Sequence, residues 1–350
     1  QQKRLAFHGV VPITKNNKEF YRANIGKASI ELDVPMNPGS VFKVASISKQ
    51  FTAMLVMLAV DENKCRLTDS LISFFPQLHD NRWRKINLHQ LLSHTSGIPH
   101  NEGINDYWVS KSRLSLSKQD ALKEIFSMKL LFDPGSDMKY SSPGYFLLAC
   151  ILETVYSRSY AAILEEKILA PLRLGHSGVY VTGKIVPGMV STYHQSGDSL
   201  IAPFRDFSLM KGSGDLFSNA DDLSTWNNSF ANSKVWSNNV QQLLFKVQTK
   251  QQPYYGYGWY IRPGKRLAYY HGGGTFGTSA LSAWYPDEQV SVVILSNISV
   301  LPVNEFWSDI EKIIFNEPVE LPAIRATIKM TTEELRSFAG TYSGKNQELN

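Results

Sequence analysis

The sequence predicts an α+β fold: an antiparallel sheet flanked by helices, with an inserted and mostly helical lobe. Apolar and polar residues alternate near both ends of the chain, over residues 8–33 and again after residue 253, which is the pattern of strands. The residues between these stretches mostly follow the helical period. Strands at both ends with helices between them indicate one sheet built by the two ends of the chain.

The first strands are expected as a small antiparallel meander over residues 8–33, where Asn and Gly interrupt the alternation. A helix is expected from Ser46, because the apolar residues that follow share one face: Phe51, Met54, Leu55, Leu58 and Ala59. Ser117, with Asp120 three residues later, predicts the start of a second helix.

Two more helices are expected at Ser142, which precedes Pro143, and near Asn219. Strands return after residue 253 with Pro286-Asp287 at a turn, and the closing DIEKIIFNE is expected as a helix. We therefore expect one domain over residues 1–328. Its sheet lobe comprises about 1–45 and 250–316, its helical lobe about 46–245, and residues 329–350 form a tail.

Charge and composition argue against several classes of protein. The net charge of +5 is mild and the basic residues are scattered, so nucleic-acid binding is not expected. No apolar stretch approaches the twenty or so residues of a membrane helix. The sequence opens without the apolar core of a signal peptide, which is expected of a mature product or of a trimmed chain. Cys65 and Cys150 form no metal spacing; we treat both as structural, and a single bridge between them stays open.

The stretch VASISKQFTAMLV, residues 44–56, places a serine hydroxyl three residues ahead of an amine. A serine is a poor nucleophile unless a base removes its proton. On a helix, Lys49 lies one turn from Ser46 on the same face, within reach of the hydroxyl. The helix N-terminus adds free N–H groups and a positive partial charge, which favour an oxyanion and lower the lysine pKa. The pair therefore has a rationale as nucleophile and base.

This spacing alone is weak evidence, because Ser-x-x-Lys also begins at Ser40, Ser115 and Ser208. Only Ser46 and Lys49 share a helix that has a long buried face. Taken by itself, the stretch is explained better by a capped core helix.

Three further stretches change that interpretation. FKVASISKQFTAML resembles the nucleophile helix of the serine β-lactamase and penicillin-binding protein superfamily, in its class C-like branch. LLSHTSGIP (91–99), FDPGSDMKYSSPGYFLLACILE (132–153) and HGGGTFGTSALSAWYPDEQVSVVILSN (271–297) follow in that family's order. The resemblance covers about residues 9–297. It implies a β-lactamase/transpeptidase-like fold, a serine hydrolase that requires no cofactor, and a periplasmic or secreted location in a bacterium.

The resemblance also implies roles for single residues. Tyr140 matches the tyrosine that carries protons together with the lysine, and a lysine ammonium nearby would lower its pKa. The backbone N–H groups of Ser46 and Gly274 match an oxyanion hole. Gly273 and Gly274 suit a strand that a substrate must approach closely.

Two positions depart from the form that degrades antibiotics. Ser142 stands where the family usually has Asn, so its binding of a substrate amide is in doubt, and it is expected mainly as a helix cap. His271-Gly272 replaces Lys-Thr, so the cation is only partly charged near neutral pH and one hydroxyl is missing. His271 would orient the substrate or assist Tyr140. These departures favour related esterases and D-amino-acid peptidases.

Other motifs are given less weight. GGGTFG (272–277) satisfies G-x-G-x-x-G, but a hairpin is expected after it where a nucleotide site needs a helix. No metal site is expected, and His94 is expected as a hydrogen-bonded loop histidine. TTEELRSFAGTYSG (331–344) resembles the start of an additional β domain in some relatives and is expected as a leftover strand or tail.

The expected activity is hydrolysis of a small ester, amide or short peptide through an acyl-enzyme, with Ser46, Lys49, Tyr140 and His271 as catalytic residues. One alternative is a β-lactamase or DD-carboxypeptidase that acts on β-lactams or peptidoglycan stem peptides. The other is a non-catalytic paralogue that binds peptidoglycan or a peptide.

Overall fold

The computed structural model describes residues 7–197, 199–231, 236–250, 252–299, 301–319 and 330–340, and the backbone of 342–344 and 347–349. Its contacts divide the chain into two units, Gln1–Trp307 and Ser308–Asn350. The predicted domain boundary after residue 328 falls within 320–329, which lies outside the described residues.

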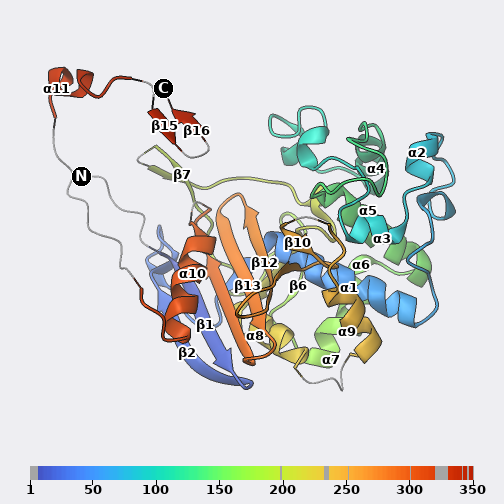
Figure 1. Ribbon diagram of the computed structural model, residues 1–350, viewed down its shortest axis with the longest axis horizontal. Helices are drawn as coiled ribbons and strands as arrows, with labels where there is room; N and C mark the ends of the chain where they lie inside the picture. Colours follow the sequence, from blue (N-terminus) through green and yellow to red (C-terminus); the bar gives the residue numbers. More distant parts are fainter. Residues whose placement is uncertain are drawn as a thin grey trace. The chain divides into compact units, whose positions relative to one another are not determined.

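The first unit is built on a seven-stranded antiparallel sheet (Figure 1) in the order β10-β11-β12-β13-β14-β1-β2. β1 from the beginning of the chain pairs with β14 from its far end, so that Gly9 lies opposite Ser296. The predicted α+β class, with one sheet shared by both ends, is confirmed. The strands are β1 (Gly9–Lys15), β2 (Lys18–Ile25), β10 (Tyr254–Tyr255), β11 (Tyr260–Arg262), β12 (Ala268–Thr275), β13 (Thr278–Tyr285) and β14 (Val290–Ser296).

The predicted meander over residues 8–33 is correct for β1 and β2 but wrong for the strand that follows. β3 (Lys27–Ser29) leaves the large sheet and pairs with β4 (Val34–Pro35) in a separate two-stranded sheet. Gly26 lies between the two sheets with φ of +77°, a region that glycine enters without steric cost. A Cβ at this position would lie 2.8 Å from the His8 ring, so the chain turns here because residue 26 has no side chain.

Two helices form the centre of the helical half, α1 (Ser48–Asp61) and α5 (Ser142–Tyr156). They pack against each other, and α1 also contacts α6 (Tyr160–Leu164) and α9 (Asn238–Phe245). Both helices are buried around most of their circumference, which is typical of core helices. α8 (Ala220–Ser229) covers one face of the sheet at β14, β1 and β13, and its Trp226 stacks on Phe51 of α1 at 4.3 Å.

Short elements complete the first unit. Ser117 and Asn219 cap their helices as predicted, because each side chain accepts a hydrogen bond from the backbone N–H three residues on. The short α-helices are α2 (Asn81–Arg84), α3 (Leu88–Leu92), α4 (Lys118–Phe126) and α7 (Ala170–Leu172). The other short helical segments are η1 (Ala45–Ile47), η2 (Leu71–Ser73), η3 (Asn101–Gly103), η4 (Lys111–Arg113), η5 (Glu165–Leu169) and η6 (Ser208–Met210). The short strands are β5 (Val41–Lys43), β6 (Gly178–Val179), β7 (His194–Ser196), β8 (Ser199–Ile201) and β9 (Leu216–Asn219).

The C-terminal elements are α10 (Val303–Ile314), which runs from the first unit into the second, α11 (Thr332–Arg336), β15 (Tyr342–Gly344) and β16 (Gln347–Leu349). α10 overlaps the predicted closing helix. The stretch from residue 331, expected as a strand or tail, begins with α11, because Thr331 and Glu334 form a capping box.

Cys65 and Cys150 are both buried and unbridged, so the bridge that the sequence left open is not formed. Burial raises the pKa of Cys65 to about 11 and that of Cys150 to about 12. Among the described residues no single helix is long and apolar enough to cross a membrane. In the part of the chain that the structure describes, one bent pair, Ser142–Tyr156 with Tyr160–Leu172, meets that test by length and composition when both helices are counted together.

Candidate active site

Ser46 lies at a sharp junction between a strand and a helix. β5 ends at Lys43, and the 3-10 turn η1 (Ala45–Ile47) continues directly into α1. Ala45 has φ of +47°, in the left-handed region, which costs a non-glycine residue ~1–2 kcal/mol. Ala45 and Ile47 are buried, whereas Ser46 between them is partly exposed. The strained junction therefore turns the Ser46 side chain toward the surface.

Lys49 lies one turn beyond Ser46 and has an exposed fraction of 0%. Its Nζ lies 3.3 Å from Ser46 Oγ, 3.0 Å from Ser142 Oγ and 2.7 Å from the Ser213 carbonyl oxygen. Burial lowers the pKa of Lys49 well below its usual value, and the charge of Arg205 lowers it further. A neutral amine has two N–H donors, which match Ser213 and Ser142, and one lone pair, which is left to accept the Ser46 proton.

Tyr140 lies two residues before the start of α5, and the Lys49 Nζ lies 4.7 Å from the centre of its ring. Its hydroxyl interacts with Ser46 and Ser142, as predicted for a group that shares a proton with the serine. The predicted lowering of its pKa is wrong. Burial raises the pKa of Tyr140 well above its ordinary value, and the neighbouring Tyr260 raises it further.

Ser142 is the first residue of α5 and does not cap it, so that prediction is wrong. The cap is Ser141, whose Oγ accepts a hydrogen bond from the Gly144 N–H at 3.2 Å. The Ser142 hydroxyl turns instead toward Lys49, whose Nζ donates to it at 3.0 Å. Sequence alone did not separate the two adjacent serines, because either could begin the helix ahead of Pro143.

His271, on β12, is 2% exposed and uncharged. Burial, with a further contribution from Lys49, lowers its pKa to about 3, so the prediction of a partly charged cation is wrong. Its Nδ1 lies 2.6 Å from the Gly272 carbonyl oxygen and therefore carries the proton, while Nε2 accepts from the Tyr255 hydroxyl at 3.2 Å. The ring lies 6.0 Å from that of Tyr140, centre to centre.

Two more histidines lie against Tyr140, the buried His94 and the partly buried His100, at ring-centre distances of 4.5 Å and 5.4 Å. The backbone N–H of Ser141 donates to His94 Nδ1, and that of Ser142 donates to His100 Nδ1, both at 3.1 Å. These N–H groups lie at the start of α5, where the helix itself provides no partner for them. The prediction of His94 as a hydrogen-bonded loop histidine is confirmed. No motif in the sequence marks the role of His100, because its partner lies 42 residues away.

This histidine layer should make folding sensitive to acid. Burial lowers the pKa of His100 and of His271 to about 3, and that of His94 well below its usual value. Between about pH 3 and about pH 6.5 these histidines bind more protons in the unfolded chain than in the folded one, so the free energy of unfolding falls as pH falls. Urea unfolding at several pH values measures this slope. His271→Gln should reduce it, with the exposed His79→Gln as control; an equal slope in all three proteins would contradict this assignment.

The strand β12 runs beside the Ser46 junction, and its glycines have different surroundings. A Cβ on Gly273 would lie 2.2 Å from the Val44 carbonyl oxygen, so Gly273 allows the strand to contact the junction. Gly274 is exposed, and a Cβ there would meet nothing within 4 Å among the described atoms. Space for a substrate therefore opens at Gly274. The oxyanion hole formed by the N–H groups of Ser46 and Gly274 stays a prediction.

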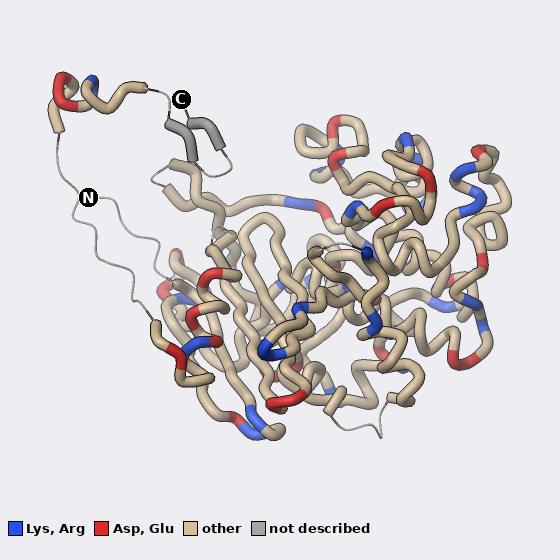
Figure 2. Tube along the Cα trace, in the orientation of Figure 1, with Lys and Arg blue, Asp and Glu red and all other residues tan. Residues whose placement is uncertain are grey.

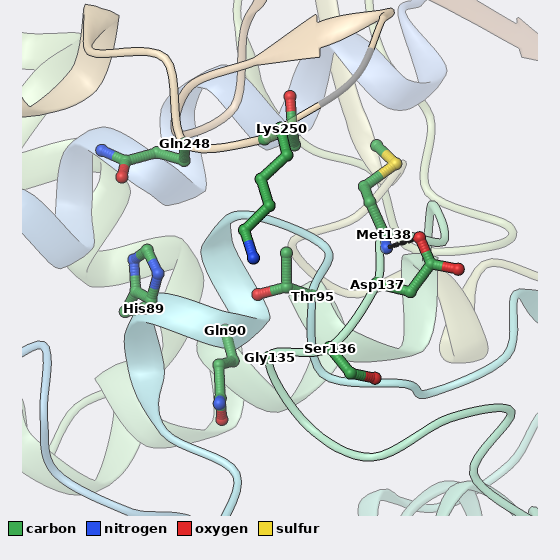
Figure 3. A pocket seen from close by; sticks show the side chains of 10 residues that line it. His89, Gln90, Thr95, Gly135, Ser136, Asp137, Met138, Gln248 and Lys250 are labelled. Carbon is green, nitrogen blue, oxygen red and sulfur yellow. Dashed lines mark hydrogen bonds between the residues drawn. The ribbon is translucent and has the colours of Figure 1, made fainter.

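A pocket of about 250 Å³ has a different lining from this region. Its lining includes Thr95, the neighbour of His94, and Figure 3 shows Lys250 reaching into it toward Thr95. None of the predicted site residues lines it. In the described part of the chain, no three His, Cys, Asp or Glu side chains are grouped as ligands for a metal ion.

This chain is similar in sequence to several curated proteins, at low identity. The putative penicillin-binding protein PbpX of Bacillus subtilis (strain 168) is 26% identical over 298 residues, which cover 85% of this chain and 72% of PbpX. Protein flp of Staphylococcus aureus (strain COL) is 25% identical over 297 residues, 82% of this chain. The match spans only 59% of the length of flp.

Solved structures share the fold. The D-amino acid amidase of Ochrobactrum anthropi SV3, complexed with D-phenylalanine, superposes with a TM-score of 0.78 at 20% identity, over 89% of this chain and 95% of the amidase. EstCE1, a hydrolase with promiscuous acyltransferase activity, superposes with a TM-score of 0.71 at 22% identity, over 84% of this chain and 90% of EstCE1. The family model described as Beta-lactamase matches residues 2–306. The chain therefore belongs to the Beta-lactamase family, within the superfamily of serine β-lactamases and penicillin-binding proteins.

Proposed function

We propose that this protein is a serine hydrolase that forms an acyl-enzyme on Ser46 with a small ester, amide or short peptide. One observation carries the proposal: the partly exposed Ser46 hydroxyl lies 3.3 Å from a fully buried Lys49 amine whose pKa is lowered well below its usual value. A buried neutral amine beside an accessible hydroxyl is the arrangement that activates a serine. A core helix alone does not need a lysine at this position.

In the acylation step, Ser46 Oγ attacks the substrate carbonyl carbon while its proton passes to Lys49 Nζ. The N–H groups of Ser46 and Gly274 hold the resulting oxyanion, and losing one such donor typically costs about 10²–10³ in rate. Tyr140, a neutral phenol at the same hydroxyl, donates its proton to the leaving oxygen or nitrogen. The protonated Lys49 then returns a proton to Tyr140, so the acyl-enzyme forms with both groups neutral again.

Deacylation reverses these proton transfers with water as the nucleophile. Tyr140 and Lys49 together take the proton of the attacking water and return one to Ser46 Oγ when the acid product leaves. His94, His100 and His271 are uncharged, so they keep the surroundings of Tyr140 free of positive charge. His271 acts in this scheme by holding the Tyr255 hydroxyl and β12 in place.

Esters and amides without a β-lactam ring fit this site best. The neutral His271 provides no cation for the carboxylate of a β-lactam. Two proteins with this fold support the choice: one is named a D-amino acid amidase, and the other, EstCE1, is described as a hydrolase. Similarity to PbpX supports the second candidate, a DD-carboxypeptidase or β-lactamase. The intact Ser46, Lys49 and Tyr140 argue against a non-catalytic paralogue. A periplasmic or secreted location is part of the proposal.

Intact-mass spectrometry with a substrate panel tests the proposal. The protein is incubated with 4-nitrophenyl esters, D-amino-acid amides and β-lactams, and both turnover and covalent mass are recorded. We expect turnover and a transient acyl mass with esters or amides. Efficient turnover of β-lactams alone would favour the second candidate, and the lack of any adduct or turnover across the panel would refute a hydrolase.

Replacing Tyr140 with Phe should lower kcat by about 10²–10⁴, because the leaving group and the attacking water lose their proton carrier. Steady-state kinetics on a 4-nitrophenyl ester and on an amide measure the loss, which should be larger for the amide with its more basic leaving group. Tyr145→Phe is the matched control. Tyr145 is also buried, but its hydroxyl donates to the Leu92 carbonyl oxygen at 2.8 Å, so its loss should affect stability more than kcat.

A further inference from the structure

Arg205 is a buried cation without an acidic partner among the described residues. It lies in the segment between β8 and η6 and is 9% exposed. Burial lowers its pKa to about 10, so the guanidinium stays charged at neutral pH. Figure 2 shows Lys and Arg interspersed with Asp and Glu along much of the first unit, yet no carboxylate in the described part pairs with Arg205. Buried charges are normally paired, so this one calls for a partner.

The free donors of Arg205 form one edge of the guanidinium. Nη1 donates to Thr275 Oγ1 at 3.3 Å, whereas Nε and Nη2 have no hydrogen-bond partner among the described atoms. The N–H groups of Nε and Nη2 point in the same direction and are spaced like the two oxygens of a carboxylate. This edge is the fork through which arginine binds a carboxylate with two parallel hydrogen bonds. An acid is therefore the ligand chemistry that completes the site.

Arg205 lies next to the reacting groups. Its partner Thr275 directly follows Gly274 on β12, and neighbouring Cα atoms are about 3.8 Å apart. The charge of Arg205 also lowers the pKa of both Lys49 and His100, which agrees with this proximity. A carboxylate bound at Arg205 would thus belong to a molecule whose carbonyl group reaches Ser46.

The geometry distinguishes the acyl part of the substrate from its leaving group. The leaving atom must lie near Tyr140, whose ring neighbours include His271 and Tyr260. His271 precedes Gly274 on β12, whereas Thr275 follows it. The order along β12 therefore favours the acyl chain, and not the leaving group, as the part of the substrate beside Arg205.

We propose that Arg205 and Thr275 form a subsite for a carboxylate on the acyl chain, so that the enzyme prefers acyl groups with a free acid a few atoms from the scissile carbonyl. This inference rests on the proposed acyl-enzyme at Ser46 and names the class of its substrates: half-esters or half-amides of dicarboxylic acids, and acyl groups of similar charge.

Aromatic rings lie around the Arg205 guanidinium. The guanidinium carbon lies 5.6 Å from the centre of the Trp108 ring and 5.5 Å from that of Phe276, with Tyr107 on a third side at 5.2 Å. Trp108 is 50% exposed, and Phe276 lies in the turn between β12 and β13. Both therefore have room to move aside for a ligand, while cation–π contact stabilises the unliganded arginine.

A matched pair of substrates tests the subsite. 4-Nitrophenyl hydrogen succinate carries the acid, and its methyl ester has the same chain without the charge. We expect a higher kcat/KM for the acid in the unmodified protein. Arg205→Met should lower that value about 10- to 100-fold for the acid, the loss expected for a hydrogen bond to a charged group, and leave the methyl ester within about threefold. Arg205→Lys should recover part of the preference.

Lys43→Met is the control, because it removes another partly buried cation, one that lies over the Tyr180 ring at 4.5 Å. It should leave the preference for the acid unchanged. Equal kcat/KM values for the two substrates in the unmodified protein would overturn the subsite, as would an equal loss on both in Arg205→Met, which is the mark of a purely structural arginine.

Calorimetric binding of monomethyl succinate separates the failure of the subsite from the failure of the proposed function. If Ser46 forms no acyl-enzyme, neither ester is turned over, but the monoester anion should still bind the unmodified protein more tightly than Arg205→Met. Equal binding to both proteins would reject the subsite independently of any turnover.

Discussion

Replacing Ser46 with Ala is expected to lower turnover of any true substrate by at least about 10³-fold and to abolish the acyl adduct. The reason is that no other described hydroxyl near Lys49 has the same exposure: Ser142 is buried, and its Oγ accepts a hydrogen bond from the amine. Removing a nucleophile leaves only the rate supplied by binding and the oxyanion hole. Pre-steady-state release of 4-nitrophenol, with covalent mass measured in parallel, follows the loss.

Ser48→Ala is the matched control for this substitution. Ser48 lies two residues on but is buried, donates to the Ala45 carbonyl oxygen at 2.6 Å and accepts from the Leu216 N–H at 3.0 Å. Its removal leaves the buried Leu216 N–H without this partner, which should cost about 1–3 kcal/mol of stability without abolishing acylation, whereas the Ala45 carbonyl oxygen keeps the Ser48 backbone N–H. Undiminished turnover in Ser46→Ala would reject the scheme outright.

Replacing Lys49 with Met should lower kcat/KM by about 10²–10⁴, because acylation loses its general base. Lys49→Arg should lower it by a comparable factor, since a guanidinium offers N–H donors but does not accept a proton. A purely structural lysine would instead tolerate Arg better than Met. Steady-state kinetics on one ester, with thermal unfolding of both variants, distinguishes these cases.

The pH dependence gives a second test of Lys49. Because burial lowers its pKa well below the usual value, the amine is the base in its neutral form, and kcat/KM should fall as pH decreases and the amine becomes protonated. The acid limb of the profile should therefore lie far below the ordinary pKa of lysine, about 10.4. Activity that rises only above pH 10 would show that Lys49 is charged in the folded protein.

The part of the site that the sequence predicted is the part that local spacing controls. Ser46 and Lys49 are three residues apart on one turn, so their contact follows from helical geometry. The fold class followed from the two kinds of periodicity, and Tyr140 followed from the order of the motifs. The prediction of one continuous meander was wrong at Gly26, where the chain passes into another sheet. The hydrophobic periodicity does not show this change, because it depends on how close the backbone at Gly26 lies to the His8 ring.

Protonation states were the main error, because they depend on burial. Tyr140 and His271 are both neutral, since each is removed from water by segments distant in sequence. A sequence shows which groups can ionise but not how far they are desolvated. Arg205 was missed for a related reason: no motif contains it, and only its tertiary contact with Thr275 brings it to the site.

The central claim is most directly tested by locating the acyl group on the protein. After quenched incubation with a reactive 4-nitrophenyl ester, proteolysis and tandem mass spectrometry should place the added acyl mass on the peptide that spans residues 44–49, at residue 46. Modification of a lysine or of another serine, with residue 46 unmodified during turnover, would contradict the account.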